Sequence, residues 1–219
     1  MRWHRDGRLR TWLGARFGGD LALGDRIWRR MLHLSGVLAL AYYAVPSGAF
    51  GPVPKSGVLL ALLAAVLAVE GARLGGLVDL PAIRPYERRR LASYAYYAIA
   101  ITVALLAFPE PIAAAVIVGS AVVDPLIGEL RPARGASASY PAVPLVAYGL
   151  LAFALVRGLG GWPIEGAAVA AALLAALAVA AEAPRLPYLD DDLTMTLVPG
   201  AVLSALLLAW PALASGGGL

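Results

Sequence analysis

Three consecutive carboxylates stand immediately before a long apolar run near the end of the chain. Asp190, Asp191 and Asp192 precede a stretch with the composition of a membrane-spanning helix. Charge so close to hydrocarbon is costly, and carboxylate oxygens are the ligands that Mg²⁺ prefers, so this placement favours a metal or phosphate site. The structural alternative is that the three side chains only cap and solvate a helix start, where the helix dipole stabilises negative charge.

Other ionisable side chains also lie at the ends of apolar runs. If the runs cross a membrane in alternation, these groups reach the same face as the aspartates, whereas the opposite face has almost none. Carboxylates at such a face can hold Mg²⁺, and arginine or histidine can neutralise phosphate oxygens. The side chains in question are Arg30, His33, Glu70, Arg73, Asp124, Glu129, Arg131 and Glu182.

Some of these groups have simpler explanations. Glu70 and Arg73 are three residues apart, which is also the spacing of an ordinary ion pair on one helix face. The tyrosines Tyr94, Tyr96 and Tyr97 have the pattern of an interfacial aromatic belt. Asp124 is harder to assign to structure alone, because it ends an apolar run and its carboxylate stays near hydrocarbon.

The composition predicts an all-α, polytopic membrane helix bundle. Of 219 residues, 60% are hydrophobic and 15% are charged, and runs of about 20 apolar residues are typical of transmembrane helices. We expect about seven spans in one helical domain at 31–214, preceded by a basic interfacial segment at 1–30 and followed by a flexible tail at 215–219. The spans are expected at 33–50, 57–74, 92–108, 111–128, 141–157, 165–183 and 193–213.

The arginines predict the orientation. With seven spans, sixteen of the eighteen Lys and Arg residues fall on one side, and only Lys55 and Arg157 fall on the other. The positive-inside rule then places the N-terminus in the cytoplasm and the site at the cytoplasmic face. The net charge of +4 follows this topology and forms no continuous stripe, which argues against nucleic-acid binding. The chain has no Cys, so disulfides and thiolate chemistry are excluded.

Four segments together resemble the dolichol kinase and phytol kinase family. They are Arg29-Arg30-Met31-Leu32-His33-Leu34-Ser35-Gly36, Glu70-Gly71-Ala72-Arg73, Ser120-Ala121-Val122-Val123-Asp124-Pro125-Leu126-Ile127-Gly128, and Glu182 to Leu197, which contains Leu189-Asp190-Asp191-Asp192-Leu193-Thr194-Met195-Thr196-Leu197. The last segment is the most specific. The chain departs from the family at Val123, where a glycine is usual. It also departs after Asp124, where Arg131 and Arg134 stand in place of a glycine-rich stretch that contains lysine.

The resemblance implies a CTP-dependent lipid kinase that uses Mg²⁺. It would transfer the γ-phosphoryl group to the hydroxyl of a membrane isoprenoid alcohol such as a polyprenol, dolichol or phytol. The implied catalytic residues are Asp124, Asp191 and His33, and the implied metal ligands are Asp124, Asp190, Asp191 and Glu182. The implied substrate- or nucleotide-binding residues are Arg30, Glu70, Arg73, Arg131, Arg134, Asp192 and Thr194.

Three other functions remain open from the sequence. A CTP-dependent cytidylyltransferase would need the same metal and nucleotide but would release pyrophosphate, and a diacylglycerol kinase would differ in the acceptor. A lipid or small-molecule transporter would place charged groups near the bilayer midplane, where the expected spans of this chain are apolar. Neither the acceptor chain length nor the oligomeric state can be predicted from the sequence.

Overall fold

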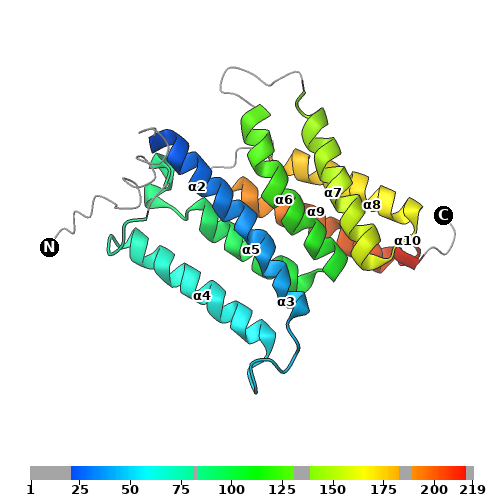
Figure 1. Cartoon of the computed structure of the whole chain (residues 1–219), viewed down its shortest axis with the longest axis horizontal. Coiled ribbons are helices and arrows are strands. Elements are labelled where there is room, and N and C mark those ends of the chain that lie inside the picture. Colours follow the sequence, from blue (N-terminus) through cyan, green and yellow to red (C-terminus); the bar gives the residue numbers. More distant parts are fainter. Residues whose placement is uncertain (1–20, 81–82, 131–138, 183–188, 216–219) are drawn as a thin grey trace.

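The described residues form helices and no strands. The computed structural model describes residues 21–80, 83–130, 139–182 and 189–215. The α-helices are α2 (Leu21–Ser35), α3 (Ala41–Ala44), α4 (Lys55–Leu74), α5 (Ser93–Ala107), α6 (Glu110–Leu130), α7 (Ala142–Gly160), α8 (Ile164–Glu182), α9 (Asp191–Ala209) and α10 (Ala212–Ser215), and two 3₁₀ helices are η1 (Gly36–Leu40) and η2 (Pro85–Arg89). Figure 1 shows the long helices side by side, with α6 in their midst.

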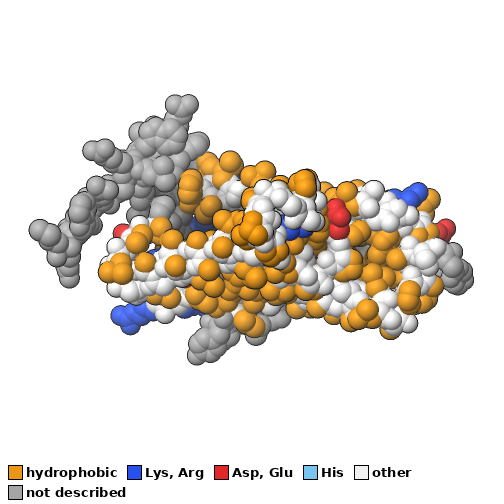
Figure 2. Space-filling model, turned by 90° about the horizontal axis from the view of Figure 1, so that it is seen from below, with side chains coloured by type: hydrophobic (Ala, Val, Ile, Leu, Met, Phe, Trp, Pro, Cys, Tyr) orange, Lys and Arg blue, Asp and Glu red, His pale blue; other side chains and the backbone are white. Residues whose placement is uncertain are grey.

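The helices have the dimensions and surface of a membrane protein. In the described part of the chain, α4, α6, α7, α8 and α9 are long and apolar enough to cross a membrane, and α5 is a shorter apolar helix. Apolar side chains cover most of the face seen in Figure 2, with few charged groups among them. The all-helical, membrane-type fold expected from composition is therefore confirmed.

The first expected span, at 33–50, is not one long α-helix. Helical backbone starts earlier, at Leu21, changes to 3₁₀ geometry at Gly36 and ends at Ala44. No proline occurs between 21 and 45 to stop the helix, whereas Val45 precedes Pro46 and is extended, because proline disfavours helical geometry in the residue before it. Helix α2 thus crosses the domain boundary that was expected at residue 30.

The core is built around α6, which packs mainly against α7 and α9. Ile112, Val116, Tyr148, Leu174 and Met195 are fully buried there. Small residues bring the backbones close: a Cβ at Gly119 would lie 2.5 Å from the Tyr148 ring. Alanines line the buried face of α8 in the same way, at 167, 170, 171, 175 and 178. This agrees with the close helix packing that its small side chains predict.

The connection between α5 and α6 is as short as its prolines predict. Phe108 is extended, as expected for a residue before proline, and α6 starts two residues later at Glu110. The turn fixes α5 beside α6 and returns the chain toward the other end of the bundle. As a result the start of α5, the end of α6 and the start of α9 lie at the same end, together with the end of α2 (Figure 1).

Candidate functional site

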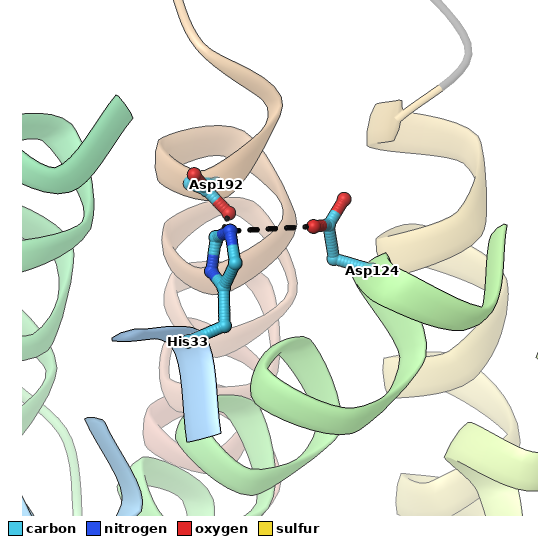
Figure 3. Close-up of side chains that lie close together, drawn as sticks. All are labelled: His33, Asp124 and Asp192. Atoms are coloured by element: carbon cyan, nitrogen blue, oxygen red, sulfur yellow. Dashed lines mark ion pairs between the residues drawn. The ribbon is translucent and has the colours of Figure 1, made fainter. Parts of the chain in front are cut away.

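His33 stands between two carboxylates that come from distant parts of the chain. Its Nε2 lies 3.7 Å from Oδ2 of Asp124 on α6, and its Nδ1 lies 3.4 Å from Oδ1 of Asp192 on α9. Figure 3 shows the three side chains converging from three different helices. Their ligand-type atoms all lie within 4.8 Å of one another. The convergence expected at one face is therefore present for these three residues.

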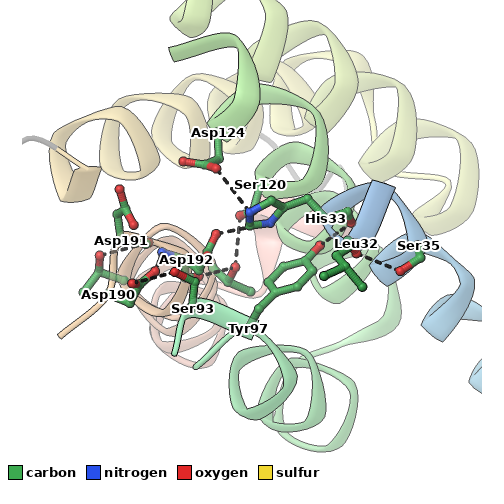
Figure 4. A network of polar contacts seen from close by, with 12 residues as sticks. Leu32, His33, Ser35, Ser93, Tyr97, Ser120, Asp124, Asp190, Asp191 and Asp192 are labelled. Atoms are coloured by element: carbon green, nitrogen blue, oxygen red, sulfur yellow. Dashed lines mark hydrogen bonds and ion pairs between the residues drawn. The ribbon is translucent and has the colours of Figure 1, made fainter. Parts of the chain in front are cut away.

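The start of α9 gathers the three aspartates. Asp190 is the N-cap, and its Oδ1 accepts a hydrogen bond from the Asp192 backbone N–H at 3.3 Å, which satisfies one of the free N–H groups at a helix start. Asp191 and Asp192 occupy the first turn. One oxygen from each of the three also lies within 4.8 Å of the others, so the cap places Asp192 between its neighbours and His33 (Figure 4).

Two buried polar atoms of the cluster lack hydrogen-bond partners. His33 Nδ1 and Asp192 Oδ1 are both buried without one, and the Asp192 side chain is only 2% exposed. A buried polar group without a hydrogen bond costs about 1–3 kcal/mol, and more when charged. A hard cation beside the carboxylates would remove that cost. The oxygen atoms of Asp190, Asp191 and Asp192 form one group that fits Mg²⁺, whereas Asp124 belongs to the group with Asp192 and His33. The imidazole of His33 suits Mg²⁺ less well than carboxylate oxygen does.

The His33 ring is held from its other side by α5. Tyr97 donates a hydrogen bond from its hydroxyl to the His33 carbonyl at 3.1 Å, and the two rings meet edge to face with centroids 5.2 Å apart. Gly36 makes this approach possible, because a Cβ there would lie 2.5 Å from Tyr97. Tyr97 is buried, so its assignment to an interfacial belt was wrong. The spacing of the tyrosines along the helix does not by itself distinguish a side chain at the membrane interface from one buried between helices.

A second polar layer fixes α9 against α6. Thr196, one turn after Asp192, donates to the Asp192 carbonyl at 2.9 Å and lies 3.0 Å from Ser120 Oγ. Thr194 Oγ1 lies 3.2 Å from both the Ala181 and the Asp191 carbonyls. These contacts tie α9 to the end of α8, and the expected role of Thr194 in binding substrate or nucleotide stays a prediction.

Glu70 and Arg73 form a buried network rather than an isolated surface pair. Arg73 makes a bidentate contact with Glu70, at 2.6 and 2.7 Å, and donates to the Arg90 carbonyl at 2.7 Å. Glu70 also accepts from the Ala92 N–H at 2.7 Å and from the Tyr94 hydroxyl. These two side chains join the end of α4 to the chain that leads into α5. Their expected role as binding residues stays a prediction.

The remaining expected residues lie at the edge of the cluster or outside it. Arg30 forms an ion pair with Glu129, and both side chains are partly exposed. Arg30 and His33 thus share the face of α2 that meets α6, as their spacing predicts. Glu182 accepts a hydrogen bond from Tyr140 at 3.2 Å and is near enough to Asp124 for their charges to interact. Arg131 and Arg134 lie outside the described residues.

The segment that closes the cluster on the α5 side was not predicted from the sequence. Glu87 caps η2 by accepting from the Arg84 N–H at 2.7 Å. Ser93 Oγ lies between the two carboxylates, 2.6 Å from Glu87 Oε1 and 3.1 Å from Asp190 Oδ2. A hydroxyl has one proton, so it donates to one of them at a time. The signal in the sequence was Arg84-Pro85-Tyr86-Glu87, a proline-opened turn with both charges inside a short connection.

Arg84 is the cation that faces the aspartates. Its charge acts electrostatically on His33, Asp124 and Asp191. Burial lowers the pKa of the Arg84 guanidinium, but the hydrogen bond to Tyr86 and the charges of Glu87 and Asp190 outweigh burial and hold that pKa above its usual value. Arg84 therefore stays charged beside the carboxylates.

The arrangement has the chemistry of a phosphate and divalent-cation site. It combines clustered carboxylates, a histidine within reach of them and a permanent cation, at one end of an apolar bundle. Comparisons with protein-family models, with curated proteins and with solved structures found no match.

Proposed function

We propose that this protein is a membrane lipid kinase. It transfers the γ-phosphoryl group of a nucleoside triphosphate, CTP by its resemblance to the polyprenol kinases, to the hydroxyl of an isoprenoid alcohol. The observation that carries the proposal is the meeting of His33, Asp124 and Asp192 within 4.8 Å, from three helices, at one end of an apolar bundle. A lipid hydroxyl at headgroup depth and a nucleotide from the aqueous side both reach such a place.

The residues divide the work of phosphoryl transfer, which is mostly positioning and charge neutralisation. Mg²⁺ fits the oxygens of Asp190, Asp191 and Asp192, where it would neutralise phosphate charge. Arg84 supplies a fixed positive charge toward the same phosphates. These groups hold the triphosphate in place for attack.

Asp124 is assigned as the base, because it is the more accessible carboxylate beside His33, 21% exposed against 2% for Asp192. The acceptor hydroxyl gives its proton to Asp124, and its oxygen forms a bond to the γ-phosphorus. The bond between that phosphorus and the β–γ bridging oxygen breaks, and nucleoside diphosphate leaves. His33 orients Asp124 and the incoming hydroxyl.

The resemblance and the charge pattern extend the proposal to topology. Counting the helical stretch 21–44 as one crossing, together with α5 and the five long helices, gives seven spans. The arginine distribution then puts the N-terminus and the catalytic end in the cytoplasm. On the same side lie the connections that carry most of the Arg residues.

The test is product analysis with purified protein, Mg²⁺, labelled CTP or ATP, and a panel of polyprenols, phytol and diacylglycerol. We expect phosphorylated alcohol and nucleoside diphosphate. Asp124→Asn should lower the rate by at least about 100-fold, the usual contribution of a positioned base. Glu110→Gln, an exposed carboxylate at the other end of α6, is the matched control and should leave the rate unchanged.

Other products would identify other functions. Pyrophosphate with a nucleotide-linked lipid would indicate the cytidylyltransferase, and phosphorylation of diacylglycerol alone would change the acceptor class. Full activity of Asp124→Asn would refute the assignment of the base. Absence of turnover with every acceptor and of Mg²⁺-dependent nucleotide binding would refute the kinase altogether.

A further inference from the structure

A partly open cavity of about 270 Å³ adjoins the carboxylate cluster at His33 and Ser93. It lies between α2, α4, α5 and the segment that leads from η2 into α5. His33, Arg84, Glu87 and Ser93 line its polar part. Leu32, Val66, Ala98 and Ile101 belong to its apolar wall. The cavity is therefore polar where it meets the site and apolar elsewhere.

The outer wall of the cavity is α4, the least buried of the five long apolar helices. Helix α4 packs mainly against α5, and Figure 1 shows it at the edge of the molecule. Leu60 and Leu62 are 50% and 61% exposed, and few residues of α4 are buried inside the protein. In a bilayer, lipid chains contact this helix directly. An apolar chain can therefore reach the cavity from the side, between α2 and α4.

His33 is shared between the cavity and the carboxylates. Its ring lines the cavity, while its two nitrogens face Asp124 and Asp192. Ser93 is shared in the same way, with its hydroxyl 3.1 Å from Asp190. A ligand hydroxyl at the polar end would thus lie beside His33, whose Nε2 is 3.7 Å from the proposed base Asp124, with its hydrocarbon against Val66 and Ile101.

The volume limits what fits. Sites for drug-sized ligands usually measure about 300–1,000 Å³. At about 270 Å³ this cavity is slightly smaller, so it takes the reacting end of one chain and leaves the rest in the bilayer. Two acyl chains joined at a glycerol would need more width beside the hydroxyl. We infer that this cavity binds the hydroxyl end of a single-chain lipid alcohol, admitted between α2 and α4, and thereby selects it over diacylglycerol.

This inference rests on the proposed function for its purpose, but its test needs no catalysis. A long-chain alcohol that carries a photoreactive diazirine near its hydroxyl is added to the full-length protein in detergent, without nucleotide or metal, and the labelled peptides are mapped. We expect labelling on α2, α4 and α5 that an excess of unlabelled polyprenol suppresses and diacylglycerol does not. Label confined to other helices, or equal suppression by diacylglycerol, would overturn the inference.

Filling the cavity provides the second measurement. Val66→Trp should reduce the labelling several-fold and, in the kinase assay, raise KM for the alcohol about tenfold while kcat and KM for the nucleotide stay unchanged. Leu62→Trp, on the same helix but exposed and outside the cavity lining, is the matched control and should change neither. Unaltered labelling in a folded Val66→Trp protein would contradict the inference. Labelling of the cavity without any kinase activity would instead contradict the proposed function alone.

Discussion

Asp192 is the most buried carboxylate of the His33–Asp124–Asp192 group, and its burial is expected to be destabilising unless a cation is bound. Its side chain is 2% exposed, beside two further aspartates, and its Oδ1 has no hydrogen-bond partner. Clustered negative charge away from water is destabilising unless a cation compensates it. We therefore expect the metal-free protein to be destabilised by the charges around Asp192, and a bound divalent cation to remove this destabilisation.

We predict that Asp192→Asn raises the melting temperature in the absence of Mg²⁺ and reduces the stabilisation that Mg²⁺ provides. In chelator, the variant should melt a few degrees above the wild type, since one of the clustered charges is gone, and 1 kcal/mol corresponds to about 2–4 °C for a chain of this size. With Mg²⁺, the wild type should gain more than the variant, because bound ligand stabilises the folded state by about 2.7 kcal/mol at 100 times Kd. Thermal unfolding in detergent measures both.

The control for this experiment is Asp79→Asn. Asp79 is an exposed aspartate between α4 and η2, so its replacement should alter neither the melting temperature nor the response to Mg²⁺. An equal Mg²⁺ response in wild type and Asp192→Asn would mean that the cation binds elsewhere.

Arg84 carries the second prediction at this scale. Its charge acts on three groups of the cluster, and a hydrogen bond to a charged group contributes about 1.5–3 kcal/mol. Arg84→Gln should therefore raise KM for the nucleotide about 10- to 100-fold. Arg88→Gln changes an exposed arginine in η2, which Arg84 directly precedes. It should leave KM for the nucleotide unchanged, and steady-state kinetics distinguish the two variants. Equal effects would indicate that only the net charge of the segment matters.

Sequence reasoning found the residues of the cluster that sit on regular helices. Asp124, His33 and the aspartates could be placed because each follows or precedes an apolar run, and alternation of spans brings such ends to one face. Arg84, Glu87 and Ser93 could not be placed in this way. They belong to a short irregular connection whose path depends on tertiary contacts, above all the capping of η2 by Glu87.

At the scale of elements, the Glu70–Arg73 network explains how that connection is held. Glu70 is 1% exposed and its oxygens receive Arg73, the Ala92 N–H and Tyr94. The pair thereby ties the end of α4 to the start of α5, next to the cavity. A role in holding this connection accounts for both side chains without any contact to phosphate.

We predict that Arg73→Met destabilises the protein strongly. It leaves Glu70 buried without its cation, a change that typically costs about 3–5 kcal/mol. Adding Glu70→Gln should recover part of the loss, because the amide still accepts from Ala92 and carries no charge. Thermal unfolding of the wild type, the two single variants and the double variant completes a double-mutant cycle. Additive losses would show that the two side chains act independently.

The helices themselves were largely predictable. The observed bounds of α4 to α9 differ from the expected spans by a few residues, because apolar runs of membrane length are a strong signal. The first span differs more, because the apolar run at 33–50 includes Pro46. The helical backbone ends at Ala44, where the proline and not the hydrophobicity sets its end. Conversely, residues 21 to 30, which mix arginines with apolar side chains, form the start of this helix although they were expected to belong to an interfacial segment.

At the scale of the whole molecule, the cluster lies at one end of the bundle, and the middle of each long helix carries no charged side chain. This distribution of charge favours the proposed enzyme over a transporter, because the binding groups of a transporter lie near the bilayer midplane. It also makes orientation decisive, because the nucleotide must arrive from the side on which the carboxylates lie. The proposal therefore fails if the end of α2, η2 and the start of α9 face away from the cytoplasm.

The absence of native cysteine makes that orientation directly measurable. Ser47→Cys, in the turn after α3, and Arg88→Cys, in η2, introduce single exposed thiols at opposite ends of α4. In intact cells a membrane-impermeant maleimide should label Ser47→Cys at once and Arg88→Cys only after permeabilisation, because α4 crosses the bilayer between them and arginines favour the cytoplasmic side. The reverse pattern would place the carboxylates outside and remove their access to cytoplasmic nucleotide. Labelling of both thiols from outside would mean that α4 does not cross the membrane, and it would contradict the proposed count of seven spans.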